Sequence, residues 1–309
     1  MRVQAEPVPP RRPRFRFLVH VPATLLVLAA LVAIPVSPAA ATTRVDTACG
    51  APLPADAVAE IVRLSDTATL SGSALERLEQ AVEQHRRITE ILVRHRDRRG
   101  LLALGLDVVE QSAVMPLQRD PAAFGNPEFA HRISLDLLQR FLRNIRAEFT
   151  GGRAEPQWAH YFTLTRDCAL SPARVAMAGY NAHLTVDLAY AVAAVRATPA
   201  DAPDHFRIVD AIANKGALIV DATKNVYGAD LGPLWRFYFL GEGLDAVFGA
   251  GVGSGALLRL ADAGANVVIF GNGLALQDPA LAPAAQAEID ALWRGADAAF
   301  VVLSANGGL

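Results

Sequence analysis

The most constraining feature of the sequence is an apolar run, Ala173–Val195, that contains a histidine and an aspartate four residues apart. The run has no proline and a single glycine, and its small and aliphatic residues predict a mostly buried helix. At about 3.6 residues per turn, His183 and Asp187 lie on one face of that helix. Because burying an unpaired carboxylate is costly, Asp187 needs a cation, a metal or strong hydrogen-bond donors.

The residues around this pair leave two interpretations open. An imidazole and a carboxylate one helical turn apart can supply two ligands to one metal ion, which would make the pair part of a functional site. Alternatively, His183 and Asp187 form a buried polar pair that fixes the packing of helices, since such networks also occur in protein cores. The pair therefore indicates a site without naming its reaction.

Helical spacing of apolar residues covers most of the chain after residue 54. Ser73 and Glu76 are spaced as a capping box at the start of one long helix. His85 and His95 fall in the charged sequence of that helix, which predicts that both are exposed to solvent. Besides the apolar run, the predicted helices are Pro54–Ser65, Ser73–Arg99, Leu101–Val114, Pro127–Phe149, Gln157–Arg166, His205–Val226, Leu257–Leu276 and Ala282–Leu303.

Alternating patterns typical of strands are rare, so we expect an all-α protein. We divide it into a linker with a first short helix at residues 42–70 and a single compact multi-helix domain at residues 71–309. The acidic and basic residues nearly balance, with a net charge of −2. Because there is no basic surplus and no basic-aromatic stripe, we expect no nucleic-acid partner.

The first forty-one residues have the features of a signal peptide. Four arginines between residues 11 and 16 form a basic region, Phe17–Val36 is apolar, and Ser37–Ala41 ends in a small-residue cleavage site. We therefore predict a signal peptide at residues 1–41, cleavage near Ala41, and a secreted or extracytoplasmic protein. The apolar segment is also long enough to span a bilayer, so the alternative is a protein anchored to the membrane by an uncleaved segment. No other membrane contact is expected.

Two cysteines, Cys49 and Cys168, remain after the predicted cleavage. In an oxidising compartment they can pair and tie the N-terminal segment to the domain. They can equally be two unrelated buried thiols, and the sequence does not decide between these interpretations.

Several motifs, taken in chain order, resemble the uncharacterised bacterial family DUF5995. They are Phe129-Ala130-x-Arg132, Trp158, Asn181-Ala182-His183-x-x-x-Asp187-Leu188 and Arg259-x-x-Asp262. The resemblance covers about Phe124–Leu276 and implies an all-helical fold with a preserved site at Asn181, His183 and Asp187. It implies no activity. Where relatives tend to have D-F-x-x-V-N, this chain has a different segment, His205-Phe206-Arg207-Ile208-Val209-Asp210.

One functional hypothesis is an exported metal-dependent hydrolase that acts on a phosphoester or another ester. The H-x-x-x-D spacing on a buried helix is similar to that of the all-helical zinc phospholipase C group. In that arrangement His183 and Asp187 bind a divalent metal, most plausibly zinc, and act at the catalytic centre. His205 and Asp210 complete the ligand set, with His160 as a further candidate. The chain has too few histidines for more than a mononuclear site.

The competing hypothesis is a non-catalytic secreted protein with a binding or structural role, in which His183 and Asp187 are internal polar residues. Its ligand is a small molecule, apolar or lipid-like, or a partner protein. A third hypothesis is a nucleotide-binding segment at the glycine-rich stretch Gly249–Gly255. Its glycine spacing departs from G-x-G-x-x-G, and the chain supplies no series of strands for the parallel sheet that such a segment needs.

Overall fold

The computed structural model describes residues 47–231, 254–305 and 307–309. These residues belong to one compact unit, Thr43–Leu309, and every regular element among them is a helix, so the all-α fold class is confirmed. The predicted signal peptide and most of the glycine-rich stretch lie outside the described residues. The helices of the first half are α1 (Ala55–Leu64), η1 (Thr67–Thr69), α2 (Ala74–Arg94), α3 (Gly100–Val109), η2 (Glu110–Val114), α4 (Met115–Gln118) and α5 (Pro127–Thr150).

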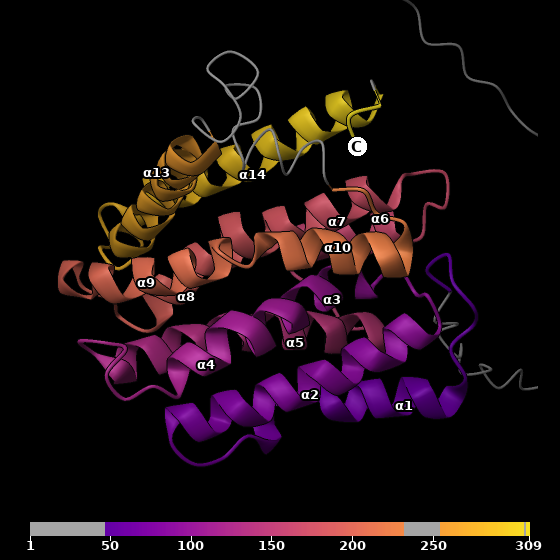
Figure 1. Cartoon of the computed structure of the whole chain (residues 1–309), viewed down its shortest axis with the longest axis horizontal. Coiled ribbons are helices and arrows are strands. Elements are labelled where there is room, and N and C mark those ends of the chain that lie inside the picture. The colour runs from indigo at the N-terminus through magenta and orange to yellow at the C-terminus, as the bar shows by residue number, and fades with distance from the viewer. Residues whose placement is uncertain (1–46, 232–253, 306) are drawn as a thin grey trace, which may run out of the picture. The chain divides into compact units, whose positions relative to one another are not determined.

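The second half continues with short helices and ends in two long ones. They are α6 (Pro156–Thr165), α7 (Pro172–Asn181), η3 (Ala182–Asp187), α8 (Leu188–Ala194), η4 (Pro199–Asp201), α9 (Ala202–Ala213), α10 (Gly216–Tyr227), α13 (Ser254–Ala275) and α14 (Ala282–Ala305). In Figure 1, α2 packs against α5 and α3, and α3 also packs against α10. The two closing helices cover the apolar run, because α13 packs on α8 while α14 packs on α7 and η3.

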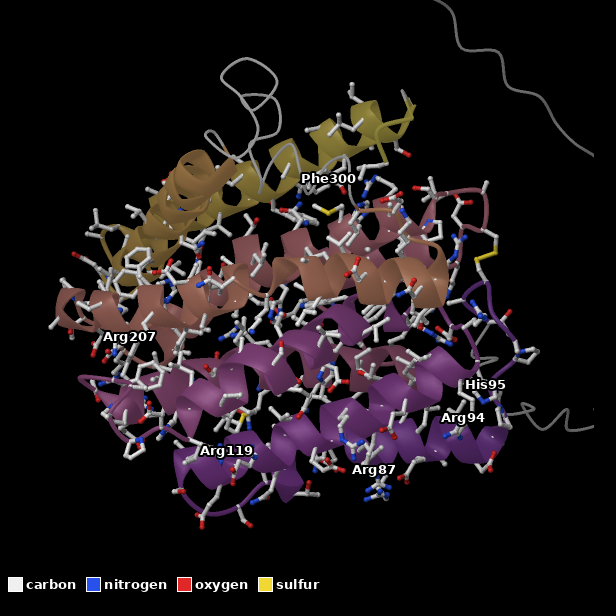
Figure 2. The ribbon with its side chains drawn as sticks, in the orientation of Figure 1. Arg87, Arg94, His95, Arg119, Arg207 and Phe300 are labelled. Carbon is white, nitrogen blue, oxygen red and sulfur yellow. A yellow bond between two sulfur atoms is a disulfide. The ribbon has the colours of Figure 1, made fainter. Side chains whose placement is uncertain are left out.

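Helix α2 illustrates how the sequence builds these layers. Ser73 and Glu76 form the predicted capping box, with the Ser73 side chain accepting from the backbone of Glu76. Buried side chains recur along one face of the helix, while arginines and glutamates cover the other face (Figure 2). Arg87, for example, pairs with Glu60 of α1 at 2.5 Å. This amphipathic pattern places the core between α2, α3 and α5.

Helix α3 lies inside the protein for nearly its whole length. The stretch Gly100–Gln118, which continues from α3 through η2 and α4, is long and apolar enough to cross a membrane by length and composition alone. However, 61% of its apolar window is buried among the other described helices. Its apolar composition is therefore accounted for by packing in the core.

The apolar run Ala173–Val195 is helical throughout but not a uniform α-helix. It consists of α7, the π-helical segment η3 and α8. A second π-helical segment, η2, interrupts the helix that starts at Gly100. Such wide turns are rare and occur frequently at functional sites. They also change which side chains share a face, because they shift the register of the residues that follow.

Two predicted helices are wrong in extent. The helix predicted to run to Arg99 ends at Arg94, because Arg96 adopts a left-handed backbone conformation, with φ 51°, that no helix continues through. The helix predicted at His205–Val226 is two helices, α9 and α10. Asn214 and Gly216 at the junction are poor helix formers, which explains the break.

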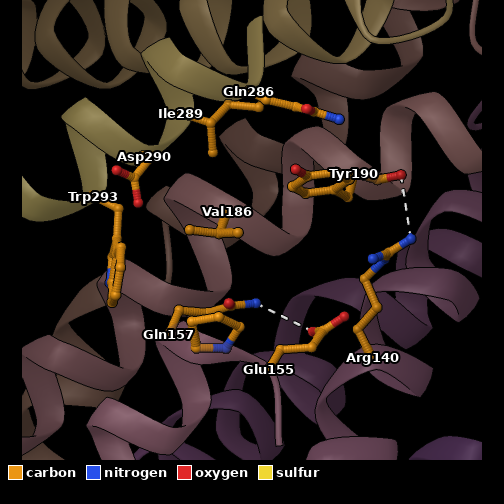
Figure 3. Close-up of a pocket in the computed structure, with 10 residues that line it drawn as sticks. Arg140, Glu155, Gln157, Val186, Tyr190, Gln286, Ile289, Asp290 and Trp293 are labelled. Carbon is orange, nitrogen blue, oxygen red and sulfur yellow. Dashed lines mark hydrogen bonds between the residues drawn. The ribbon is translucent and has the colours of Figure 1, made fainter. Parts of the chain in front are cut away.

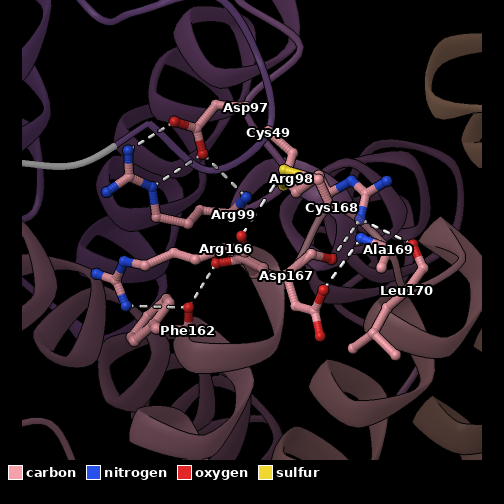
Figure 4. The surroundings of a disulfide bond; sticks show 11 residues. Cys49, Asp97, Arg98, Arg99, Phe162, Arg166, Asp167, Cys168, Ala169 and Leu170 are labelled. Carbon is pink, nitrogen blue, oxygen red and sulfur yellow. Dashed lines mark hydrogen bonds and ion pairs between the residues drawn. A yellow bond between two sulfur atoms is a disulfide. The ribbon is translucent and has the colours of Figure 1, made fainter.

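Cys49 and Cys168 form a disulfide with Cα atoms 5.5 Å apart, so the first of the two interpretations holds (Figure 4). Arg98 reinforces this connection. Its backbone N–H donates to the carbonyl of Ala48 at 2.8 Å, and its guanidinium donates to the carbonyl of Leu170 at 2.9 Å. A cross-link that closes a loop of 119 residues stabilises the fold by about 5 kcal/mol in the chain-entropy account.

Candidate functional site

Asp187 is fully buried at the end of the π-helical segment η3, and it is held by two neutral donors from α6. Gln157 Nε2 donates to its Oδ1 at 2.9 Å, and Trp158 Nε1 donates to its Oδ2, also at 2.9 Å. Burial raises the pKa of Asp187 to about 7, although both donors act in the opposite direction. The sequence left open whether a cation, a metal or strong hydrogen-bond donors accompany Asp187. In the structure, hydrogen-bond donors do.

His183 is also buried, but its surroundings differ from those of Asp187. Its ring lies edge-on to Trp158 with 6.5 Å between centroids, and its Nδ1 has no hydrogen-bond partner. Burial lowers the pKa of His183 to about 3, so the imidazole is neutral at physiological pH. His183 and Asp187 thus both contact Trp158, as expected for inward residues of one segment, while Asp187 takes its hydrogen bonds from α6.

The other two predicted metal ligands lie on α9. His205 is buried, packs against Phe270 of α13 with 4.8 Å between ring centroids, and has an unpartnered Nε2. Burial lowers the pKa of His205 to about 4. Asp210 is exposed. Within the described ranges, no group of three or more His, Cys, Asp or Glu side chains is placed to hold a metal ion. The four predicted ligands are therefore not assembled into one site, and the zinc centre stays a prediction.

His85 is a correction to the sequence analysis, because it is fully buried rather than exposed. Its Nδ1 lies 2.7 Å from Oε2 of Glu110, which η2 carries into the core. Burial lowers the pKa of His85, but the nearby Glu110 carboxylate outweighs this effect, and the pKa lies above its ordinary value. No local pattern predicts this pair, because its members lie twenty-five residues apart, on different helices.

A pocket of about 360 Å³ opens next to Asp187 (Figure 3). It lies where α14 faces α5, the start of α6, η3 and α8. Gln157 connects the pocket to Asp187, because its side chain lines the pocket and donates a hydrogen bond to the Asp187 carboxylate. The lining residues are Arg140, Glu155, Pro156, Gln157, Val186, Tyr190, Gln286, Ile289, Asp290 and Trp293.

Gln157 bridges two carboxylates. Its Nε2 donates to Oε2 of Glu155 at 3.2 Å as well as to Asp187, so those two carboxylate oxygens lie within about 6 Å of each other. The charge of Glu155 contributes to the raised pKa of Asp187, after burial. Because both hydrogens of the amide group are used in this way, the side-chain orientation of Gln157 is determined by its neighbours.

The wall formed by α14 is attached to the body of the domain through polar contacts. Asn181 Nδ2 donates to the backbone carbonyl of Trp293 at 2.8 Å. Asp297, one turn further along α14, accepts from Arg174 at 2.6 Å and lies 3.0 Å from Nε2 of His160. His160, a further candidate ligand from the sequence, is thus engaged at the α14 interface.

Sequence reasoning missed most of the pocket, including Glu155, Gln157 and Asp290. One signal was available, since Glu155-Pro156-Gln157 places polar side chains around a proline that starts a helix. Nothing in their spacing, however, connects these residues to Asp187 or to α14.

Comparison with known proteins gives one match. The model of a family of unknown function, DUF5995, matches residues 78–238, about half of the chain. The match includes Asn181, His183 and Asp187, but it begins and ends earlier than the range 124–276 expected from the motifs. Helices α13 and α14 therefore lie beyond it. Neither a curated protein nor a solved structure matches the chain.

Proposed function

The chain belongs to the DUF5995 family, and from this premise we propose that it is a non-catalytic binding protein that holds a small polar ligand in the pocket beside Asp187. The function of the family is unknown, so the proposal rests on the geometry of the site. Two residues of the N-A-H-x-x-x-D-L motif each bond a wall of the pocket, and this observation carries the proposal. Asp187 holds the Gln157 amide, and Asn181 holds the Trp293 backbone.

The dimensions of the pocket support a small ligand. Its volume of about 360 Å³ lies near the lower end of the range of roughly 300–1,000 Å³ for ligand pockets in proteins. Its lining combines an aromatic and aliphatic surface with a few polar side chains, which is the usual composition of such pockets. The apolar or lipid-like ligand expected from composition stays a prediction, and decanoate is included among the probes below to test it.

In this proposal Asp187 is a positioning residue. It does not line the pocket and is fully buried, so it acts through Gln157. Burying the Asp187 carboxylate next to the Gln157 amide costs free energy, because the carboxylate must lose its bound water. Its presence is better explained if the orientation of Gln157 matters for what the pocket binds.

The experiment uses a pocket-filling variant with a matched control. Gln286→Trp places a large side chain in the pocket from α14, whereas Ala287→Trp places the same side chain on the exposed neighbouring position. Maltose, glucose 6-phosphate, choline and decanoate are tested by calorimetry and by thermal unfolding of the mature protein. We expect at least one probe to raise the Tm of the native protein and of Ala287→Trp, but not of Gln286→Trp. Equal binding by both variants would contradict the pocket.

The metal-dependent hydrolase stays a prediction, with His183, Asp187, His205 and Asp210 as its residues, and it has a direct test. Elemental analysis of the purified protein measures zinc, manganese and iron, and bis-p-nitrophenyl phosphate measures hydrolysis. Stoichiometric metal that is lost in His183→Ala, together with hydrolysis, would replace the binding proposal. Metal-free protein without hydrolysis would leave the binding proposal in place.

Export is part of the same proposal. The Cys49–Cys168 disulfide supports an oxidising compartment, because structural disulfides are rare in the cytosol. The N-terminal sequence of the protein recovered from its native host tests the cleavage. A mature chain that starts at Thr42 is expected, whereas an intact N-terminus in the membrane fraction would indicate the anchored alternative.

A further inference from the structure

We infer that the pocket binds a neutral, hydroxyl-rich ligand of the size of a mono- or disaccharide, and that Gln157 sets this specificity. The inference rests on the proposed binding function and adds the class of ligand. It follows from the charges around the pocket, the orientation of the Gln157 amide and the shape of the apolar walls.

The charges disfavour an anionic ligand. Among the described residues that line the pocket, Glu155 and Asp290 are acidic and Arg140 is the single basic residue. Arg140 is already engaged, since its Nε donates to Asp136 at 2.7 Å and its Nη2 donates to the carbonyl of Tyr190 at 3.3 Å. Asp187 lies directly behind Gln157. A phosphate or carboxylate would therefore meet like charges without an uncommitted cation.

A strongly cationic ligand also gains little, because the acids of the pocket are already engaged: Oε2 of Glu155 accepts from Gln157 and from Asn144. Asp290 is in addition neutralised by Arg294 at 2.7 Å. What remains is a mixture of donors and acceptors with little net attraction for either sign of charge. Hydroxyl groups match this mixture because each one both donates and accepts.

Gln157 presents an acceptor to such a ligand. Its Nε2 donates to Asp187 and to Glu155, so its carbonyl oxygen is the atom left for the pocket. Glu155 also accepts from Asn144 Nδ2 at 3.0 Å through the same Oε2, which leaves its second oxygen as another acceptor. Gln157 and Glu155, which both line the pocket, therefore each have an acceptor left for a hydroxyl group.

The remaining walls suit the carbon skeleton of a sugar. Trp293 and Tyr190 provide ring surfaces on two sides, and Val186 and Ile289 add aliphatic surface (Figure 3). Trp293 is held in place by His160, whose ring lies edge-on to it with 6.0 Å between centroids. The volume of about 360 Å³ lies within the range of roughly 300–1,000 Å³ for pockets that bind small molecules.

The test measures maltose and glucose binding by calorimetry, with glucose 6-phosphate, choline and decanoate as the alternative classes. We expect maltose or glucose to bind the native protein, and the affinity to fall about tenfold or more in Gln157→Leu, which removes the acceptor. Gln111→Leu changes an exposed glutamine on η2 and should bind as the native protein does. Urea unfolding verifies that each variant folds, and Gln286→Trp replaces Gln157→Leu as the test if the latter does not fold.

The outcomes distinguish failure of the proposed ligand class from failure of the proposed binding function. Binding of choline, decanoate or glucose 6-phosphate that Gln286→Trp abolishes would overturn the ligand class while the pocket proposal stands. Sugar binding that Gln157→Leu and Gln286→Trp leave unchanged would overturn the assignment to this pocket. If none of the five probes binds, both the ligand class and the binding function fail.

Discussion

Two of the buried carboxylates, Glu110 and Asp187, lie on the π-helical segments η2 and η3 but have opposite surroundings. Glu110 pairs with the imidazole of His85 at 2.7 Å, in the core between α2 and η2. Asp187 is bound by the neutral donors Gln157 and Trp158, and through Gln157 it reaches a pocket. The charge of a carboxylate that pairs with a cationic side chain is compensated within the pair. A carboxylate bound by neutral donors instead fixes the orientation of those donor side chains. The comparison indicates a structural role for Glu110 and a positioning role for Asp187.

The largest expected effect is the removal of the partner of Glu110. His85→Leu leaves a carboxylate buried without its cation, and we expect the free energy of unfolding to fall by about 3–5 kcal/mol in urea titrations. His95→Leu, at the partly exposed end of the same helix, should change it by less than about 0.5 kcal/mol. Because a buried ion pair can be replaced by apolar residues, His85→Leu combined with Glu110→Leu should recover most of the loss. A double variant as unstable as the single one would speak against a purely structural pair.

The next largest effect is expected on the pH dependence of the free energy of unfolding, through the titration of Asp187. Its pKa is raised from an ordinary value of 3.8 to about 7 in the folded protein. Between these values the unfolded chain has already lost the proton that the folded protein retains, so this group makes stability fall as pH rises from about 4 to 7. The loss is about 1.4 kcal/mol for each unit of the shift.

The measurement is the free energy of unfolding from pH 4 to pH 8 for the native protein and for Asp187→Asn. The free energy of unfolding of the native protein minus that of Asp187→Asn should decrease as pH rises, since the variant lacks the titrating group. A difference that does not change with pH would mean that Asp187 stays ionised when buried. The surroundings of Asp187 would then resemble those of a stabilised carboxylate.

A smaller effect is expected on ligand binding. In Asp187→Asn, the amide can accept from either Gln157 or Trp158 through one oxygen, while its NH₂ group opposes the other donor. We expect the orientation of Gln157 to be lost and the affinity for the sugar probe to fall about tenfold, or about 1.4 kcal/mol. Asp221→Asn removes an exposed carboxylate on α10 and serves as the control. Unchanged affinity in Asp187→Asn would break the proposed connection between this residue and the pocket.

The smallest effect is expected at His183, a buried histidine whose Nδ1 has no hydrogen-bond partner. His183→Phe replaces a neutral buried ring, whose Nδ1 makes no hydrogen bond, with an apolar ring. We expect the free energy of unfolding to change by less than about 1.5 kcal/mol, in contrast to His85→Leu. A much larger loss, together with loss of bound metal, would instead favour the predicted zinc site, because structural metal binding contributes directly to folding.

Much of the fold was predictable from local patterns. Helical spacing of apolar residues gave the all-α class and most helices, and the Ser73–Glu76 capping box gave the start of α2. The same spacing, together with the apolar flanks, showed that His183 and Asp187 point inward. The site was only half predictable, since the motif identified Asp187 but not the residues that it holds.

The sequence by itself determined which segments are helical and that His183 and Asp187 are buried, because both follow from the spacing of apolar neighbours within a few turns. It did not determine the burial of His85, whose local sequence is charged and whose partner Glu110 lies on another helix. Only the tertiary structure decided what those polar residues contact. Gln157 meets Asp187 across thirty residues and Trp293 meets Asn181 across 112, through helices whose packing no local pattern specifies. Pairing between helices depends on the register and the wide turns of η2 and η3, and these are products of the packed core.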